Sequence, residues 1–311
     1  MIAAKSMAAF AAGVVLLAGT ASAQDDHGEN VGPSTKDTSL DFGEVSGNVR
    51  LATDYVFRGF TNTDGGPQIQ ADLTWAFANG FYLGVWSSNT DFGGQGSTME
   101  IDPFVGYAGQ IGDSPFSYDV GYWAYFYPSA ELDLDGDGQT ENVDIDYGEV
   151  YLYLTFTHGG FSLSPNIWYA DDYSGDDCLP DTPAVSYELY GAQAVPGGWL
   201  NGWLDGLSIS GIYGEQTFDE TRGVPDLDYT FYDLGLSYVI DRFTLDVRWH
   251  DSDDVSPLFL PSDLVGPRWV AAVTRSFQLS AKAKAPTGGQ RGETRYERRR
   301  TGTWTRKPGY A

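Results

Sequence analysis

Oxygen-bearing side chains recur between residues 133 and 144 with the spacing of a calcium-binding loop. Ca²⁺ prefers hard oxygen ligands, and Gly138, at the sixth position, permits the sharp turn of an EF-hand loop. Against this interpretation, the flanking segments predict strands instead of helices, and the last ligand is an aspartate where a longer glutamate is usual. Calcium binding and a solvated acidic loop therefore both stay open. The six candidate ligands are Asp133, Asp135, Asp137, Gln139, Glu141 and Asp144.

A second set of polar and charged side chains shares one face of several short segments that alternate between apolar and polar residues. If these segments are strands of a closed barrel, this face lines the lumen. Carboxylates outnumber guanidiniums in the set, and rings of Asp and Glu favour cations. A lumen filled by paired charges is the alternative. The predicted pore-lining residues are Asn48, Arg50, Asp54, Arg58, Asp72, Glu100, Asp102, Asp119, Glu149, Glu188, Asp233, Asp246, Arg248 and Arg268.

Side chains that could support catalysis are few and far apart in the sequence. The three histidines are His27, His158 and His250, and no two are close enough to suggest a local metal site or a Ser/His nucleophile. The single cysteine, Cys178, excludes an internal disulfide framework. We therefore predict that the chain is not an enzyme and needs no cofactor, apart from Ca²⁺ if the loop at 133–144 binds it.

Alternation with a period of two residues predicts the elements that carry these side chains. In residues 45–58 the odd positions are mostly apolar, with Val49, Leu51, Tyr55 and Phe57, whereas the even positions include the charged candidates above. Successive side chains of a strand point to opposite faces, so one face suits hydrocarbon and the other suits water. We predict that 45–58 is one strand with Tyr55 and Phe57 facing lipid.

Twelve such segments predict an all-β fold, a transmembrane antiparallel up-and-down β-barrel. Their connections alternate between mostly short turns and longer polar loops, as expected for the two sides of an outer-membrane barrel. A secreted β-sandwich or β-solenoid also alternates and is the competing fold. The predicted strands are residues 45–58, 67–78, 81–88, 100–108, 116–127, 147–157, 161–169, 185–192, 207–213, 230–240, 243–250 and 269–277.

The two ends of the chain differ in composition from the predicted barrel at 45–277. Residues 1–23 have a lysine, an apolar run and an Ala-Ser-Ala cleavage pattern, which predict a signal peptide for export. Residues 24–44 are predicted to be a disordered lead. Residues 278–311 hold nine Lys or Arg and two Glu, which predicts a basic disordered tail; a native appendage and the product of a shifted frame or read-through both stay open.

The last predicted strand ends on an aromatic residue. Trp269, Val273 and Phe277 share one face and are similar to the C-terminal assembly signal of outer-membrane proteins, although Arg275 departs from the usual apolar pattern. We therefore expect this strand to contact the outer-membrane assembly machinery.

Four motifs carry a resemblance to a known family. The chain has LATDYVFRG at 51–59, NGFYLGVWSSN at 79–89, MEIDPFVGY at 99–107 and YFYP at 125–128. Together they resemble the TorF-type porin family of proteobacteria, over roughly residues 45–277. The resemblance implies an outer-membrane barrel with a pore, and it brings no catalytic residues and no settled substrate.

From these observations we predict an outer-membrane porin, a passive channel for small hydrophilic solutes or ions with cation preference. The alternative is a non-conducting structural or adhesion barrel whose acidic outer loops bind Ca²⁺. The expected partners are outer-membrane lipids, lipopolysaccharide, the assembly machinery and small solutes, but no nucleic acid. The sequence predicts no oligomeric state.

Overall fold

The computed structural model describes residues 43–133, 138–179, 182–219, 226–256 and 263–280, together with the short pieces 297–298 and 304–305. The predicted signal peptide and nearly all of the predicted lead at 24–44 lie outside the described residues. Among the residues described, no helix has the length and apolar character needed to cross a membrane.

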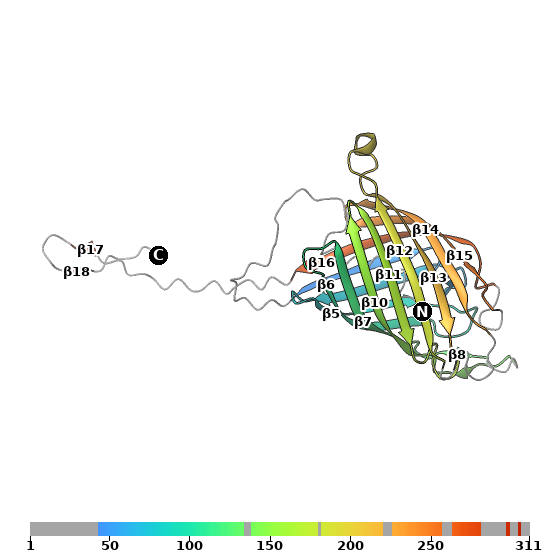
Figure 1. Cartoon of the computed structure of the whole chain (residues 1–311). Coiled ribbons are helices and arrows are strands. Elements are labelled where there is room, and N and C mark those ends of the chain that lie inside the picture. Colours follow the sequence, from blue (N-terminus) through green and yellow to red (C-terminus); the bar gives the residue numbers. More distant parts are fainter. Residues whose placement is uncertain are drawn as a thin grey trace.

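Twelve antiparallel strands in the described part of the chain close into one barrel (Figure 1). The order around the barrel follows the sequence, and the first and last strands pair to close it. The predicted all-β barrel is therefore confirmed. Its strands are β1 (Glu44–Ala52), β4 (Gln68–Ala76), β5 (Phe81–Asn89), β6 (Met99–Gln110), β7 (Phe116–Tyr125), β10 (Tyr147–His158), β11 (Phe161–Ala170), β12 (Ala184–Ala194), β13 (Leu207–Phe218), β14 (Tyr229–Ile240), β15 (Phe243–Asp253) and β16 (Arg268–Ser280).

Strand β4 shows how the sequence sets the two faces of the wall. Gln68, Gln70 and Asp72 are buried inside the barrel, while Ile69, between them, is 64 % exposed and Leu73 is 44 % exposed. Large apolar side chains are exposed in the same way around the barrel. An apolar band of this extent costs free energy in water and suits contact with hydrocarbon.

The connections divide the barrel into two ends, which we call the turn end and the loop end. The turn end carries the β4–β5 hairpin at Asn79-Gly80, where Gly80 has a φ of 95°. Glu44 at the start of β1 pairs with Ser280 at the end of β16 at this same end. The longer β12–β13 connection, which contains the 3₁₀ helix η1 (Trp199–Gly202), projects away from the barrel (Figure 1).

The prediction of one strand over residues 45–58 is wrong beyond Ala52. Strand β1 ends there, and the chain turns into the barrel as a hairpin of β2 (Val56–Phe57) and β3 (Phe60–Thr61) before β4 begins. Arg58 and Gly59 form its tip with φ values of 38° and 89°, a conformation that ends an extended strand. We call residues 53–67 the inward hairpin.

Aromatic packing explains why the inward hairpin leaves the wall. Phe57 and Phe60 are buried, with their rings edge to face at 6.0 Å between centroids, and Tyr55 packs against Trp86 of β5 at 5.8 Å. Tyr55 and Phe57, predicted to face lipid, therefore face the barrel interior. Alternation alone does not distinguish an apolar residue facing lipid from one packed against the inner wall.

Two smaller hairpins complete the described elements. Strands β8 (Glu131–Leu132) and β9 (Glu141–Asn142) pair in the β7–β10 loop. In the basic tail, β17 (Glu297–Arg298) pairs with β18 (Trp304–Thr305). Strand β16 also continues to Ser280, where the prediction ended it at Phe277.

Candidate functional site

The barrel interior has two unlike halves. Along β5–β11, large aromatic side chains fill the space, and we call this region the packed half. Phe104 and Trp123 stack at 4.3 Å between ring centroids, and Tyr151 lies 4.9 Å from Trp168. These side chains are almost fully buried, so this half contributes little open lumen.

Three predicted pore-lining acids lie in the packed half as buried hydrogen-bond acceptors. They are Glu100, Asp102 and Asp119, none more than 2 % exposed. The Tyr127 hydroxyl donates to Glu100 Oε1 at 2.9 Å. Trp123 Nε1 donates to Asp102 at 3.0 Å, and the Tyr82 hydroxyl donates to Asp119 at 2.6 Å. The partners of a buried carboxylate must come from the protein, and here neighbouring aromatic residues supply them.

Arg58, at the tip of the inward hairpin, forms an ion pair with the opposite wall. Its Nη1 and Nη2 donate to the two Oε atoms of Glu149 at 2.9 and 3.2 Å, and its Nε lies 3.5 Å from Glu188 Oε1. All three side chains are buried. The guanidinium also lies 5.6 Å from the Trp168 ring centroid. We call Arg58, Glu149 and Glu188 the hairpin ion-pair cluster.

Three of the predicted pore-lining residues belong to this cluster and therefore do not line an open pore. Arg58 does not lie on the wall of β1, and Glu149 and Glu188 are its countercharges, buried away from open water. One feature of the sequence indicates a turn here, because Gly59 follows Arg58 at the end of a long alternating segment. Nothing local to that segment identified the partners, which lie on β10 and β12.

Further aromatic side chains pack together at the loop end. Tyr173, from the β11–β12 loop, is fully buried and lies 5.0 Å from the Tyr147 ring and 5.4 Å from the Phe218 ring. Burial raises the pKa of the Tyr173 phenol, which keeps this loop residue neutral. Aromatic rings from the β11–β12 loop, β10 and β13 therefore pack together at the loop end.

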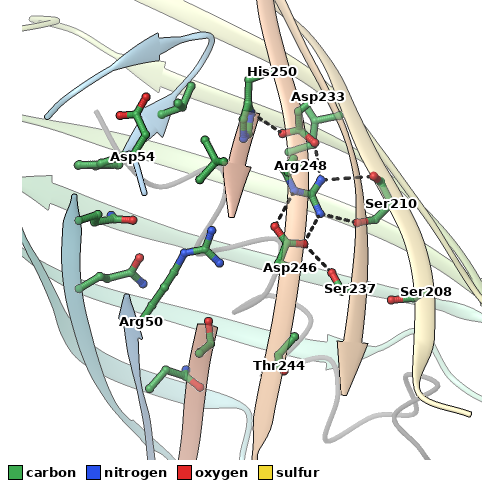
Figure 2. A pocket seen from close by; sticks show the side chains of 18 of the residues that line it. Arg50, Asp54, Ser208, Ser210, Asp233, Ser237, Thr244, Asp246, Arg248 and His250 are labelled. Atoms are coloured by element: carbon green, nitrogen blue, oxygen red, sulfur yellow. Dashed lines mark hydrogen bonds and ion pairs between the residues drawn. The ribbon is translucent and has the colours of Figure 1, made fainter. Parts of the chain in front are cut away.

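The other half of the interior holds a polar cavity of about 320 Å³ between the inward hairpin and the walls formed by β12–β16, β1 and β4 (Figure 2). We call it the polar cavity. It is lined by seven of the predicted pore-lining residues, namely Asn48, Arg50, Asp54, Asp72, Asp233, Asp246 and Arg248.

Arg248 organises one wall of the polar cavity (Figure 2). Its Nη2 donates to Asp246 Oδ2 at 3.2 Å and to Ser210 Oγ at 2.8 Å, and its Nη1 donates to Asp233 Oδ1. His250, which the sequence analysis did not place in the lumen, lies with Nδ1 3.7 Å from Asp233 Oδ2. Three strands, β13, β14 and β15, contribute to this wall, so no single segment of the sequence could have identified it.

Asp54 joins the base of the inward hairpin to the barrel wall. Its Oδ1 accepts hydrogen bonds from the Thr61 and Thr63 hydroxyls at 2.5 and 3.1 Å. Its Oδ2 accepts from Arg268 Nη1 at 3.2 Å. Arg268 begins β16, so this pair ties the hairpin to the strand next to β1.

The candidate calcium loop lies partly outside the described residues, because 134–137 are not described. Of the remaining candidate ligands, Asp133 Oδ2 accepts from Gly138 N at 2.9 Å, and Glu141 lies in β9. Asp144 N donates to Asp177 Oδ2 at 2.7 Å. Within the described ranges, no cluster of three His, Cys, Asp or Glu side chains is placed to hold a metal. Calcium binding stays a prediction.

The predicted assembly residues lie on β16 at the seam of the barrel. Trp269 is 70 % exposed, and Phe277 pairs in register with Gly47 of β1. A Cβ atom at position 47 would come within 2.6 Å of the Phe277 ring, so glycine leaves room for this aromatic residue at the seam. Their contact with an assembly machinery stays a prediction.

Residues 38–277 match the family model described as "Bacterial protein of unknown function (Gcw_chp)". No curated protein matches the chain.

Among solved structures, the NanC porin is similar with 11 % identity and a TM-score of 0.49, covering 75 % of this chain and 100 % of that one. The KdgM porin has 12 % identity and a TM-score of 0.44, covering 75 % and 99 %. The COG4313 outer membrane channel from Pseudomonas putida F1 has 12 % identity and a TM-score of 0.43, covering 79 % and 100 %.

Proposed function

The chain belongs to the Gcw_chp family of bacterial proteins of unknown function, and we propose that this member is a narrow outer-membrane channel for small hydrophilic solutes. One observation carries the proposal: a closed barrel exposes an apolar band outside and encloses a charged polar cavity inside. Only a closed barrel lets strands cross hydrocarbon with every backbone group paired. The resemblance to TorF-type porins and the signal-peptide pattern at 1–23 agree with it.

Under this proposal the turn end faces the periplasm and the loop end faces outward, in contact with lipopolysaccharide. The barrel wall contacts outer-membrane lipids, and β16 with Trp269, Val273 and Phe277 engages the assembly machinery. Short periplasmic turns and longer outer loops are the usual arrangement in such barrels.

We further propose that the channel prefers cations. Four aspartates line the polar cavity, Asp54, Asp72, Asp233 and Asp246, against two arginines, Arg50 and Arg248. The whole chain is also strongly acidic, with a net charge of −25. An excess of carboxylates lowers the free energy of a cation in a narrow lumen.

Single-channel recording of the full chain in a planar bilayer under a KCl gradient tests both proposals. Small discrete conductance steps with a cation-selective reversal potential are the expected result. A reversal potential that favours chloride would overturn the cation preference. A folded barrel that stays silent would overturn the channel itself.

The inward hairpin favours a second candidate function, a non-conducting structural or adhesion barrel. Residues 54–63 are buried within the lumen and narrow the loop end. In that case the acidic outer loops would carry the function, with Ca²⁺ held at 133–144. Calorimetric titration of the full chain with Ca²⁺ tests this candidate, because heat of binding at millimolar Ca²⁺ is expected only if the loop forms a site.

A further inference from the structure

The polar cavity contains an arginine, Arg50, that forms no ion pair with any residue that the structure describes. Arg50 of β1 lies between its cross-strand neighbours, Gln70 of β4 and Thr274 of β16. Its side chain extends from the β1 wall into the cavity (Figure 2). Among the described residues it makes no hydrogen bond and no ion pair. A guanidinium is always charged and has five N–H donors, so this group is free to bind an anion.

The carboxylates that line the same cavity each have another donor, and Asp246 and Asp233 attract Arg50 only through their charges, without an ion pair to it. Their partners hold them on the walls, as Figure 2 shows for the Arg248 cluster. The pairs are Asp54 with Arg268, Asp72 with Asn48, and both Asp233 and Asp246 with Arg248. A carboxylate entering the cavity would therefore find the Arg50 guanidinium unoccupied.

Neutral hydrogen-bonding side chains surround the same space. Four of them line the cavity and make no side-chain hydrogen bond to another described residue: Gln70, Ser208, Thr244 and Thr274. Amide and hydroxyl groups both donate and accept, so they suit a ligand that carries hydroxyl groups. Two of these four residues, Gln70 and Thr274, flank Arg50 directly in the sheet.

We propose that Arg50, with these four neutral residues, forms a binding site for a small hydroxy-carboxylate. The ligand's carboxylate pairs with the Arg50 guanidinium, and its hydroxyl groups bond to the amide and hydroxyl side chains. The volume of about 320 Å³ falls within the range of small-molecule sites, at its lower end. The proposal rests on the proposed channel and concerns a local anion site at Arg50, within a lumen whose remaining lining charges favour cations.

Equilibrium binding to the full chain in detergent micelles tests the site without requiring conduction. The probe is gluconate, and the matched control ligand is sorbitol, which has the same carbon chain with a hydroxymethyl group in place of the carboxylate. Calorimetry compares the wild-type chain with Arg50→Gln and with Arg242→Gln. Arg242 lies exposed in the β14–β15 turn and controls for the loss of one positive charge.

The wild-type chain is expected to bind gluconate more tightly than sorbitol. Arg50→Gln should weaken gluconate binding about tenfold, since it removes a charged hydrogen-bonding partner. Arg242→Gln should leave the affinity unchanged. Thr274→Val, which removes a hydroxyl and keeps the charge, should weaken gluconate binding by a smaller factor and provides a second variant if Arg50→Gln fails to fold.

Equal affinity for gluconate in the wild-type and Arg50→Gln chains would overturn the site, as would equal affinity for gluconate and sorbitol. Failure of the site and failure of the channel are distinguishable. Gluconate binding that depends on Arg50 in a silent barrel supports the site and overturns only the channel. Conduction without such binding overturns only the site.

Discussion

At the scale of single residues, the unpaired Arg50 and the paired Arg58 have opposite environments. Arg50 faces the polar cavity and forms no ion pair within the described part of the chain, whereas Arg58 is buried against Glu149 and Glu188. The first contributes to the electrostatic potential that an ion meets in the cavity. The second contributes to the stability of the inward hairpin.

Replacing Arg50 with glutamine should make the proposed channel more cation-selective. The cavity would then keep its four aspartates and lose one of two lining guanidiniums. The reversal potential in a KCl gradient measures the change, and Arg242→Gln at the exposed turn is the control. A shift toward anion selectivity would contradict the placement of Arg50 in the conducting path.

Replacing Arg58 with alanine should destabilise the barrel by about 3–5 kcal/mol, because it leaves Glu149 and Glu188 buried without their countercharge. Denaturant unfolding in detergent or lipid measures the free energy of unfolding. Arg242→Ala, at an exposed position, should change it by less than about 0.5 kcal/mol. A similarly small effect of Arg58→Ala would show that the cluster does not hold the hairpin.

At the scale of elements, the inward hairpin places the buried residues 54–63 inside the lumen. Because Ala52 pairs directly with Gln68, the β1 and β4 wall strands are already adjacent where the hairpin departs. A two-residue turn is long enough to join them as a simple β-hairpin. The intervening residues are therefore not needed to connect the wall strands.

Replacing residues 53–67 with Asn-Gly should increase single-channel conductance, because it removes the side chains that close the loop end. The replacement should be combined with Glu149→Gln and Glu188→Gln, so that no buried carboxylate is left without Arg58. A wild-type hairpin carrying the same two glutamines is the control for the lost charges. Unchanged conductance in the shortened barrel would place the constriction elsewhere.

At the scale of the whole molecule, the exposed apolar band determines where the barrel is stable. Leu73 of β4 is 44 % exposed on the outer face, beside Gly47 of β1 and Val85 of β5 in the ladder. The same exposure in water would be unfavourable, so the band ties the stability of the barrel to a hydrocarbon environment.

Replacing Leu73 with arginine should reduce stability in lipid by about 2–4 kcal/mol if this position lies near the bilayer midplane. Folding into lipid vesicles, followed by heat-modifiable mobility in gels, measures the effect. Leu200→Arg is the matched control, because Leu200 is 71 % exposed in η1 on the projecting β12–β13 connection. Equal loss in both variants would contradict a lipid-facing wall.

The sequence by itself determined the wall of this barrel. Each of the twelve predicted strands corresponds to an observed strand, because alternation, glycine turns and chain direction are local properties that a regular antiparallel wall preserves. The Asn79-Gly80 hairpin is an example, since its turn residues and both flanking strands are adjacent in the sequence. Local pattern also separated the outer face from the inner face at most positions of the wall.

Only the tertiary structure decided how the interior is used. Tyr55 and Phe57 continue the alternation of β1, yet they turn inward, where Tyr55 packs against Trp86 of β5 and Phe57 packs against Phe60 of the same hairpin. The partners of Arg58 are Glu149 and Glu188, far away in the sequence. Whether a lumenal charge is paired, as in that cluster, or free, as at Arg50, depends on contacts across the barrel, which a period-two pattern does not encode.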